Sequence, residues 1–401
     1  FWSGGGEADY QVFIITGRLA ELTISAEATG AAGPTAMVVG VAEGRIWGMS
    51  SAERLQRIFR RLGLPENDGA ADAAGAVLVA DARWVFDQAL IGALAKHPGV
   101  ILVDDDGVPA AIHGKGEAMR VALQRLAAGE DLAAVAPDYP RLTALEVGST
   151  YNSELRKKEP PILRRLTKAN VGEVEKRLFQ GSYKGVTDLV TKYVWPAPAR
   201  VVTRWCALAG ITPNQVTFAS FLLVLAAFAL FWTGHFGWGL VCAWIMTFLD
   251  TVDGKLARVT LTSSKWGNVF DHGIDLVHPP FWWWAWLVGV QASLHPVGAP
   301  TLILVVIVAG YVIQRMLEGV FLGLFKVEMH AWRPFDSFFR LITARRNPNL
   351  ILLTGASLVG RPDVGLVLVA VWTALSLLVH LIQVLQGLIT PRGQVTSWLA
   401  R

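Results

Sequence analysis

The chain has 401 residues and a net charge of +4, and 53% of its residues are hydrophobic against 17% charged. Its mean hydropathy of +0.41 averages over two unlike parts, because most charges precede about residue 200 and long apolar stretches follow from about residue 205. The sequence therefore predicts a soluble region followed by a polytopic membrane region. The two cysteines, Cys206 and Cys242, exclude a disulfide framework and fit a reducing compartment for the soluble region.

Residues 1–175 are predicted to form an α/β domain. Apolar runs indicate strands at residues 34–40, 76–80 and 99–103, and capped or periodic stretches indicate helices at residues 50–62 and 85–96. This alternation favours a parallel, Rossmann-type sheet with helical crossovers. Ligands of such sheets lie at the carboxyl ends of strands, where residues 43–45 and Asp81 fall, whereas residues 104–106 are expected to form a solvated turn.

The order of these elements resembles that of sugar-type nucleotidyltransferases. Such enzymes have a Gly-rich loop ending in Arg after the first strand and a metal-binding Asp after a later strand. Residues 40–45, G-V-A-E-G-R, depart from the glycine spacing of that loop, and the loop-plus-lysine insert before residue 50 is missing. We therefore expect this nucleotidyltransferase-like domain to be non-catalytic, and a role as a partner-binding scaffold stays open.

Residues 176–210 are predicted to be a linker with an interfacial helix. Eight Lys and Arg residues between positions 155 and 179 favour a surface near anionic lipid headgroups, and without interleaved aromatic residues we expect no nucleic-acid binding. Apolar residues at positions 186, 189, 190, 193 and 194 follow helical spacing, which predicts an amphipathic helix in the membrane interface. Pro196 and Pro198 are expected to end that helix.

Residues 211–401 are predicted to form an all-α membrane domain. Six apolar stretches indicate transmembrane helices at residues 214–233, 237–259, 267–292, 299–325, 347–360 and 364–390, of which the fifth is short. Lys and Arg residues concentrate in the loops after the second and fourth spans and after the sixth, so this side is expected to be cytosolic. Both termini then lie in the cytosol, and the protein is expected in the inner or plasma membrane.

Four aspartates interrupt the second and third spans. Asp250 and Asp253 share one helix face, Asp271 and Asp275 share another, and a short turn between the two helices would bring all four carboxylates together. An Asp at the centre of a membrane helix costs roughly 2.5–3.5 kcal/mol, so we expect compensation by a metal or a water-filled site. A cation channel is the alternative, but it predicts acidic residues in the outer halves of the spans as well, where there are none.

Carboxylate ligands without His or Cys favour Mg²⁺, Mn²⁺ or Ca²⁺ over zinc. Two such ions can clamp a diphosphate, and a carboxylate not fully used by metal can accept a proton from an attacking hydroxyl. Gly254 and Gly267 permit a close approach, and Arg258 can bind a phosphate. The pattern therefore favours displacement at a phosphorus of a diphosphate by an alcohol, at a site that opens to the cytosol.

Residues 250–275 resemble the full signature of the CDP-alcohol phosphotransferase family, D-x2-D-G-x2-A-R-x8-G-x3-D-x3-D. The resemblance implies a homodimeric membrane enzyme that transfers a phosphatidyl-type group from a CDP-alcohol to a hydroxyl with release of CMP. It implies two Mg²⁺ or Mn²⁺ ions held by Asp250, Asp253, Asp271 and Asp275, with Asp275 also a candidate general base. The residues implied to border the nucleotide are Gly254, Ala257, Arg258, Gly267, Asn214 and Thr217.

The whole layout resembles fused inositol-1-phosphate cytidylyltransferase/di-inositol-phosphate phosphate synthases, whose first domain makes the CDP-alcohol that the second consumes. The donor is therefore open between CDP-diacylglycerol and a CDP-polyol, as is a second activity in the first domain. Arginines crowd the loop between the fourth and fifth spans, where they either bind a phosphate on an alcohol or polyol-phosphate acceptor or follow the positive-inside bias. These candidate acceptor-binding residues are Arg333, Arg340, Arg345 and Arg346.

Overall fold

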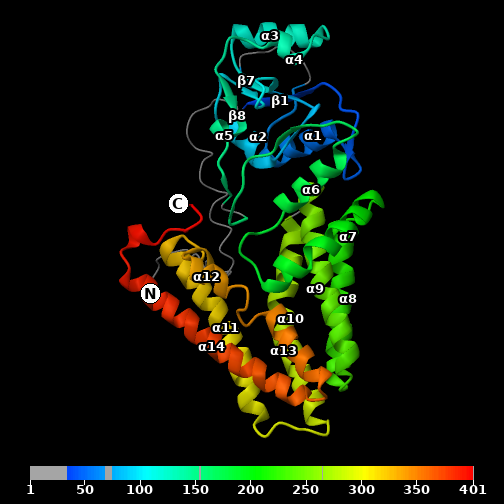
Figure 1. Cartoon of the computed structure of the whole chain (residues 1–401), viewed down its shortest axis with the longest axis vertical. Helices are drawn as coiled ribbons and strands as arrows, with labels where there is room; N and C mark the ends of the chain where they lie inside the picture. Colours follow the sequence, from blue (N-terminus) through cyan, green and yellow to red (C-terminus); the bar gives the residue numbers. More distant parts are fainter. Residues whose placement is uncertain (1–33, 68–74, 153–154, 264, 401) are drawn as a thin grey trace, which may run out of the picture.

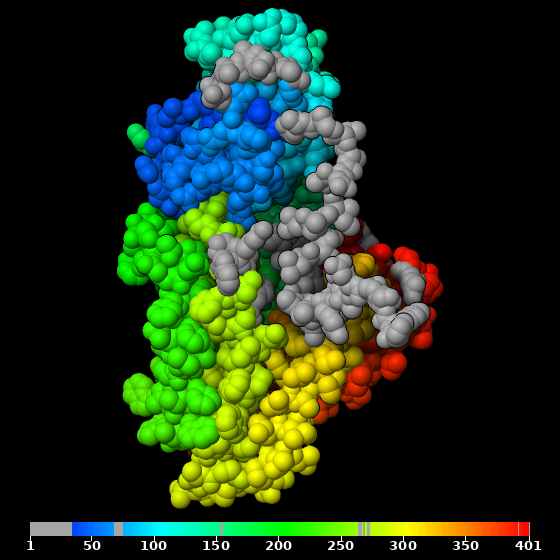
Figure 2. All heavy atoms as spheres, turned by 180° about the vertical axis from the view of Figure 1, so that it is seen from behind, coloured from blue at the N-terminus to red at the C-terminus, as the bar shows by residue number. Residues whose placement is uncertain are grey.

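The structure is a computed structural model that describes residues 34–67, 75–152, 155–263 and 265–400, and only the backbone at residues 265, 266, 268, 271, 272 and 392. An α/β lobe stands at one end of a lobe of long helices, and the chain passes between them through α6 (Val171–Gly181) and α7 (Pro196–Leu208) (Figure 1). Figure 2 shows the same two lobes from behind, with the α/β lobe in blue and cyan. The predicted division into an α/β region and a helical region is confirmed.

A mixed sheet of five strands lies at the centre of the described part of the α/β lobe, in the order β1-β4-β7-β6-β8. β1 is parallel to β4 and β6 is parallel to β8, whereas β7 is antiparallel to both of its neighbours. The prediction of an all-parallel sheet was wrong, because the five residues between β6 and β7 are too few for a helical crossover and return the chain as a hairpin. The five strands are β1 (Thr35–Val39), β4 (Val77–Asp81), β6 (Val100–Val103), β7 (Pro109–Gly114) and β8 (Arg141–Thr143).

Helix α1 (Ser51–Leu62) begins where the capping pattern predicts, since the Ser50 side chain accepts a hydrogen bond from the Glu53 backbone N–H at 3.1 Å. Helix α2 (Gln88–Leu94) starts later than predicted, because the preceding residues form β5 (Trp84–Phe86) and pair with β11 (Leu163–Arg165). The remaining elements of this lobe are β2 (Arg45–Ile46), β3 (Met49–Ser50), β9 (Tyr151–Asn152), β10 (Lys157–Lys158), α3 (Glu117–Ala127), α4 (Leu132–Val135) and α5 (Ala144–Val147).

The linker differs from its prediction. A π-helical turn, η1 (Val190–Val194), replaces most of the expected amphipathic helix, with Val186 and Val190 buried and Tyr193 exposed. Pro196 and Pro198 begin α7 instead of ending a helix. The physical reason is that a proline in the first helical turn lacks only an N–H that has no partner there.

Within the described residues, six helices occupy the positions predicted for the spans. They are α8 (Pro213–Trp232), α9 (Phe236–Val259), α10 (Lys265–Gln291), α11 (Pro300–Phe325), α13 (Arg346–Leu358) and α14 (Pro362–Ile389), with η2 (Met329–Ala331), α12 (Pro334–Phe339) and η3 (Arg392–Gln394) outside them. Three helices of the described chain, α8, α11 and α14, are long and apolar enough to cross a membrane. Helix α13 has 13 residues, about 20 Å of a core about 30 Å thick, so it does not cross by itself.

The α/β lobe contacts the end of α9. Arg54 of α1 donates from Nη1 to the Val259 carbonyl at 2.8 Å, and Arg57 donates to the Thr260 carbonyl at 2.7 Å. These carbonyls lie at the carboxyl end of α9, where they have no partner within the helix. Arginines of the α/β lobe therefore cap the helix that contains Asp250 and Asp253.

We expect Gly40→Ala to destabilise the α/β lobe strongly. Gly40 has a φ of +70°, and a Cβ there would lie 2.4 Å from Oδ1 of the fully buried Asp81. Gly63→Ala is the matched control, because Gly63 has a φ of +69° and no atom within 4 Å of its Cβ position. Both variants should lose about 1 kcal/mol from the backbone conformation, and Gly40→Ala about 1–3 kcal/mol more from the displaced carboxylate. Thermal unfolding of the full chain in detergent measures this difference, and equal melting temperatures would contradict it.

Candidate active site

Carboxylates from α9 and α10 meet at one arginine. Arg346, in the first turn of α13, donates from Nη2 to Oδ2 of Asp250 at 2.5 Å and from Nη1 to Oδ1 of Asp275. Because one guanidinium reaches both carboxylates, the two aspartates face the same space between the helices, as helical spacing predicts. Asp271 lies between them in sequence on α10, and its side chain is outside the described residues.

Asp253 is one helical turn further along α9 than Asp250, and its side chain is more buried. Its side chain is buried, and Oδ2 accepts a hydrogen bond of 2.6 Å from Oγ1 of Thr217 on α8. Oδ1 of the same carboxylate is buried and has no hydrogen-bond partner among the described residues. Thr217 thus orients the Asp253 carboxylate, and one oxygen is left for a group outside the protein.

The other residues of the signature lie around this space. Arg258 donates from Nη1 to the Gly254 carbonyl at 3.1 Å, and Ala257 is half-buried beside it on α9. A Cβ at Gly254 would meet only the Arg258 side chain, at 3.5 Å. Gly267 is near the start of α10, and Asn214 is exposed in the first turn of α8. The structure therefore distributes the proposed nucleotide-binding residues over three helices.

The linker supports the start of α13. Oδ1 of Asp188 accepts hydrogen bonds from Nδ2 of Asn347 at 2.9 Å and from the Thr191 backbone N–H at 3.0 Å. Burial alone would raise the pKa of Asp188, but the charge of Arg340 and the hydrogen bonds from Asn347 and Thr191 leave that pKa below its ordinary value. Asp188 is therefore ionised at neutral pH, and it fixes the residue next to Arg346.

The four candidate acceptor arginines do not gather at one point. Arg346 lies between the two aspartates, and Arg345 pairs with Glu318 of α11, Nη2 to Oε2 at 2.6 Å. Arg333 instead donates to Asp336 and, at 2.7 Å, to Gln386, with its guanidinium over the Trp332 ring. Arg340 has a buried Nη1 without a partner among the described residues, and burial lowers its pKa.

A cavity of about 600 Å³ is lined by sequence neighbours of Asp275 and Arg346. Its lining includes Leu276, which follows Asp275, and Arg345, which precedes Arg346. Glu318 and Arg315 of α11 also line it, together with His330 of η2. Sequence reasoning placed His330 in the loop beside the site but missed Arg315 and Glu318, although two charges three residues apart inside an apolar span were a signal of a buried polar site.

Glu318 lies at the centre of a polar cluster beside this cavity. Its Oε1 is 3.2 Å from Nε2 of both His330 and His380, and it accepts hydrogen bonds from Arg315 at 2.8 Å and Arg345 at 2.7 Å. The carboxylate and the two imidazoles have ligand atoms within 4.8 Å of one another, a spacing that a metal ion could use. Two guanidinium groups already neutralise the one carboxylate, however, so a divalent cation would meet an excess of positive charge.

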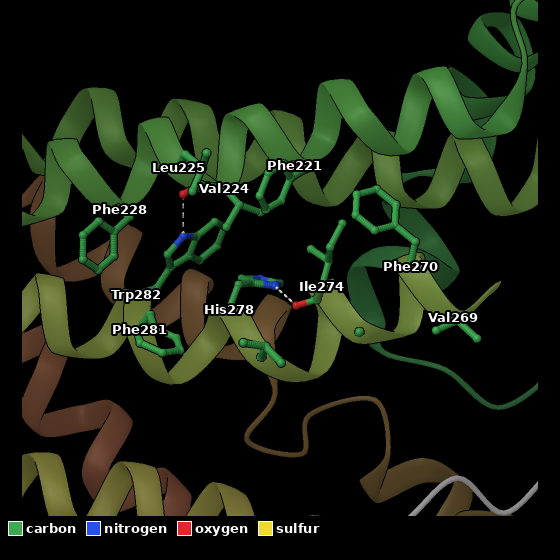
Figure 3. Close-up of a pocket in the computed structure, with 12 residues that line it drawn as sticks. Phe221, Val224, Leu225, Phe228, Val269, Phe270, Ile274, His278, Phe281 and Trp282 are labelled. Atoms are coloured by element: carbon green, nitrogen blue, oxygen red, sulfur yellow. Dashed lines mark hydrogen bonds between the residues drawn. The ribbon is translucent and has the colours of Figure 1, made fainter. Parts of the chain in front are cut away.

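An apolar groove of about 620 Å³ lies between α8 and α10. Figure 3 shows Phe221, Val224 and Phe228 on one side and Ile274 and Phe281 on the other. Trp282 donates to the Val224 carbonyl at 3.0 Å, and Nδ1 of His278 contacts the Ile274 carbonyl at 2.7 Å. Nε2 of His278 is buried and has no hydrogen-bond partner among the described residues. Ile274 is the neighbour of Asp275, so hydrocarbon in this groove would lie close to the carboxylates.

Asp81 of the α/β lobe is saturated by Arg83. The carboxylate is fully buried and accepts from Nε of Arg83 at 2.7 Å and 3.0 Å, and from the Arg83 backbone N–H at 2.8 Å. Arg83 also pairs with Asp131, which lowers the pKa of Asp131. Arg45 of the glycine-poor loop donates to the Gly48 carbonyl at 2.9 Å.

The residues on α9 and α10 fit a divalent cation. The unpartnered Oδ1 of Asp253 is the kind of buried atom that needs a positive charge nearby. Asp250 and Asp275 already attract one cation, the Arg346 guanidinium, and carboxylate oxygens are the preferred ligands of Mg²⁺ and Mn²⁺. By contrast with Glu318, the aspartates here outnumber the arginine that binds them.

Residues 210–344 match the family model described as CDP-alcohol phosphatidyltransferase. Among curated proteins, a phosphatidylinositol phosphate synthase of Mycobacteroides abscessus is 37% identical over 83 residues, 19% of this chain and 38% of that protein. An archaetidylinositol phosphate synthase of Pyrococcus horikoshii is 38% identical over 79 residues, 20% of this chain and 42% of that protein. Human ethanolaminephosphotransferase 1 is 36% identical over 98 residues, 20% of this chain and 23% of that protein.

The chain thus spans about two fifths of the length of the first two of these relatives. Among solved structures, the phosphatidylinositol phosphate synthase of Mycobacterium tuberculosis with CDP-DAG bound is 21% identical. The match covers 50% of this chain and 96% of that one, with a TM-score of 0.36.

We expect Thr217→Val to weaken Mn²⁺ binding about 10- to 100-fold, the usual cost of losing a side chain that orients a metal ligand. The substitution keeps the shape of the side chain and removes the donor to Asp253. Thr217→Ser should restore most of the affinity, and Ser220→Ala, which removes a buried hydroxyl of α8 bonded to the Met246 carbonyl, should leave it unchanged. Electron paramagnetic resonance of free Mn²⁺ measures the affinity, and equal values for Thr217→Val and the wild type would refute the role of Thr217.

Proposed function

We propose that the chain, whose residues 210–344 match the CDP-alcohol phosphatidyltransferase family model, is a divalent-metal-dependent membrane transferase. It transfers a substituted phosphate group from a CDP-alcohol to an acceptor hydroxyl and releases CMP. The observation that carries the proposal is that Asp250 of α9 and Asp275 of α10 meet at Arg346, while Asp253, one turn from Asp250, has one buried oxygen unpartnered among the described residues.

Asp250, Asp253 and Asp275, with Asp271 from the same stripe of α10, are the residues that would hold the two ions. Bound there, the ions supply charge neutralisation for the diphosphate of the donor. Arg258 and the small residues Gly254, Ala257 and Gly267 border the diphosphate and cytidine, and Asn214 contributes from the start of α8. Thr217 belongs to this group by position and acts by orienting Asp253.

Asp275 is the candidate general base. Its carboxylate is 41% exposed, against 18% for Asp250, so an acceptor hydroxyl can reach it from solvent. The hydroxyl proton would pass to an oxygen of Asp275 while the hydroxyl oxygen attacks the phosphorus, and CMP leaves. Arg346 holds Asp275 and Asp250 on one guanidinium, which keeps the base beside the reacting diphosphate.

The surroundings support a lipid on the donor side and a polar acceptor. The apolar groove between α8 and α10 suits the hydrocarbon chains of a diacylglycerol donor, which favours CDP-diacylglycerol over a CDP-polyol. The cavity lined by Arg315 and Arg345 suits an alcohol that has a negative charge, such as a polyol phosphate. The named relatives include synthases of inositol phosphate lipids, in line with such an acceptor.

We place six helices, α8 to α11, α13 and α14, in the membrane. Helix α13 starts at Arg346, at the level of Asp250 and Asp275 within the membrane, and reaches the outer side from there, so the chain crosses six times. Both termini and the opening of the site then lie on the cytosolic side, where positive residues concentrate, and the enzyme works as a homodimer. The α/β lobe keeps a scaffold role, because Arg83 neutralises the aspartate at the carboxyl end of β4. An α/β lobe that also makes the CDP-alcohol is the alternative, and that pairing disfavours it.

Asp275→Asn and Asp253→Asn should each reduce CMP release about 10²- to 10⁴-fold, because one removes the base and the other a ligand. The assay uses purified protein with Mn²⁺, CDP-diacylglycerol and a panel of polyols and polyol phosphates. Asp363→Asn is the matched control, since Asp363 at the start of α14 pairs with Arg361 at 2.7 Å and touches no residue of the site. Full activity in Asp275→Asn and Asp253→Asn would disprove the assignment.

Asp81→Ala should leave CMP release within about twofold of the wild type, because Asp81 serves only the fold of the α/β lobe. The protein should also release no pyrophosphate from CTP with any polyol phosphate. The free energy of unfolding should fall by about 1–3 kcal/mol, because the Arg83 backbone N–H loses its acceptor when the fully buried Asp81 carboxylate is removed. CTP-dependent pyrophosphate release that Asp81→Ala abolishes would establish the bifunctional alternative instead.

A further inference from the structure

Three arginines and two glutamates, Arg156, Arg315, Arg345, Glu318 and Glu328, line the cavity of about 600 Å³ and leave it with one net positive charge. Arg156 forms an ion pair with Glu328 at one side of the cavity. Arg315 and Arg345 both pair with Glu318. The cavity therefore attracts anions, and two of its lining residues, Leu276 and Arg345, are the sequence neighbours of Asp275 and Arg346.

Glu318 accepts hydrogen bonds from only one nitrogen of each arginine. Arg315 and Arg345 each donate to it from Nη2, and the Nη1 group of each has no hydrogen bond to any described residue. In these two side chains the buried atoms without a partner are the Nε groups. The Nη1 groups are therefore accessible to solvent. Two guanidinium groups thus present accessible donors beside one cavity, in orientations that Glu318 sets.

Two histidines hold Glu318 in turn. Nδ1 of His380 lies 2.7 Å from the Ser376 carbonyl and Nε2 lies 3.2 Å from Oε1 of Glu318, two acceptors to which a ring with a proton on each nitrogen donates. His330 approaches the same oxygen from η2, also at 3.2 Å. Burial lowers the pKa of His330 to about 3, against the opposing hydrogen bond to Glu318, so this ring is neutral. Side chains from α11, η2 and α14 therefore determine one carboxylate position.

We propose that Glu318 is a positioning residue that orients Arg315 and Arg345 to bind the phosphate of a phosphorylated acceptor. The pairing keeps two mutually repelling guanidinium groups together and turns their free Nη1 donors toward one anion, and a planar guanidinium suits phosphate well. This rests on the proposed function, with its phosphorylated acceptor, and adds the residue that positions the two arginines for that phosphate.

The test is binding of inorganic phosphate to the full chain in detergent, by isothermal titration calorimetry. Simple electrostatics predicts that Glu318→Gln binds phosphate more tightly, because a negative charge leaves the cavity. Positioning predicts the reverse, a loss of about tenfold or more, since the arginines lose their orientation. Glu328→Gln is the matched control, because it removes a negative charge from the same cavity and should not weaken phosphate binding.

Glu318→Asp should recover part of the affinity, and His380→Gln should lose a few-fold while leaving the carboxylate in place. His380→Gln also serves if Glu318→Gln fails to fold. With an active enzyme, Glu318→Gln should raise the KM for a polyol phosphate and leave the KM for the CDP-alcohol unchanged.

Phosphate binding that is unchanged or tighter in Glu318→Gln would overturn the proposal. So would bound metal in the dialysed wild type that His330→Gln removes, because Glu318 would then be a metal ligand. The calorimetry does not depend on turnover, so an absence of CMP release with intact, Glu318-dependent phosphate binding would refute the proposed function alone.

Discussion

The helical lobe depends on the compensation of charges that lie between apolar helices. Asp250 and Asp275 come from different helices and share the Arg346 guanidinium, and Asp253 receives the Thr217 hydroxyl. Removal of one partner from such a contact would leave an unpaired charge in an apolar environment, at a cost of about 3–5 kcal/mol. The same contacts bring α8, α9, α10 and α13 together, so the packing of the lobe and the geometry of the candidate site have one cause.

A second compensated charge, Glu318, lies beside the first. The two sites differ in their balance of positive and negative charges. Two arginines surround the one carboxylate of Glu318, whereas the aspartates of α9 and α10 outnumber Arg346. The excess of arginine around Glu318 favours binding of an anion, and the excess of aspartate around Arg346 favours binding of cations. Two neighbouring sites of opposite preference suit a reaction in which an anionic acceptor meets a metal-bound diphosphate.

The α/β lobe and the linker contribute to this arrangement from outside the apolar helices. Arg54 and Arg57 cap the carboxyl end of α9, and Asp188 of the linker holds Asn347 next to Arg346. Asp81, at the carboxyl end of β4 in this lobe, is neutralised by Arg83. The lobe is therefore joined to the helix ends around the site, a role that needs no catalysis of its own.

The sequence by itself determined the helices of the C-terminal region and the meeting of Asp250 with Asp275, because helical periodicity is local and a spacing of three or four residues selects one face. It failed at β7, where a connection of only five residues returns the chain as a hairpin and makes the sheet mixed, and at Pro196, which begins α7 instead of ending a helix. Only the tertiary structure decided the partners of these charges. Arg346 is 96 residues from Asp250, and His380 is 62 residues from Glu318, and no local pattern specifies pairs that packing alone brings together.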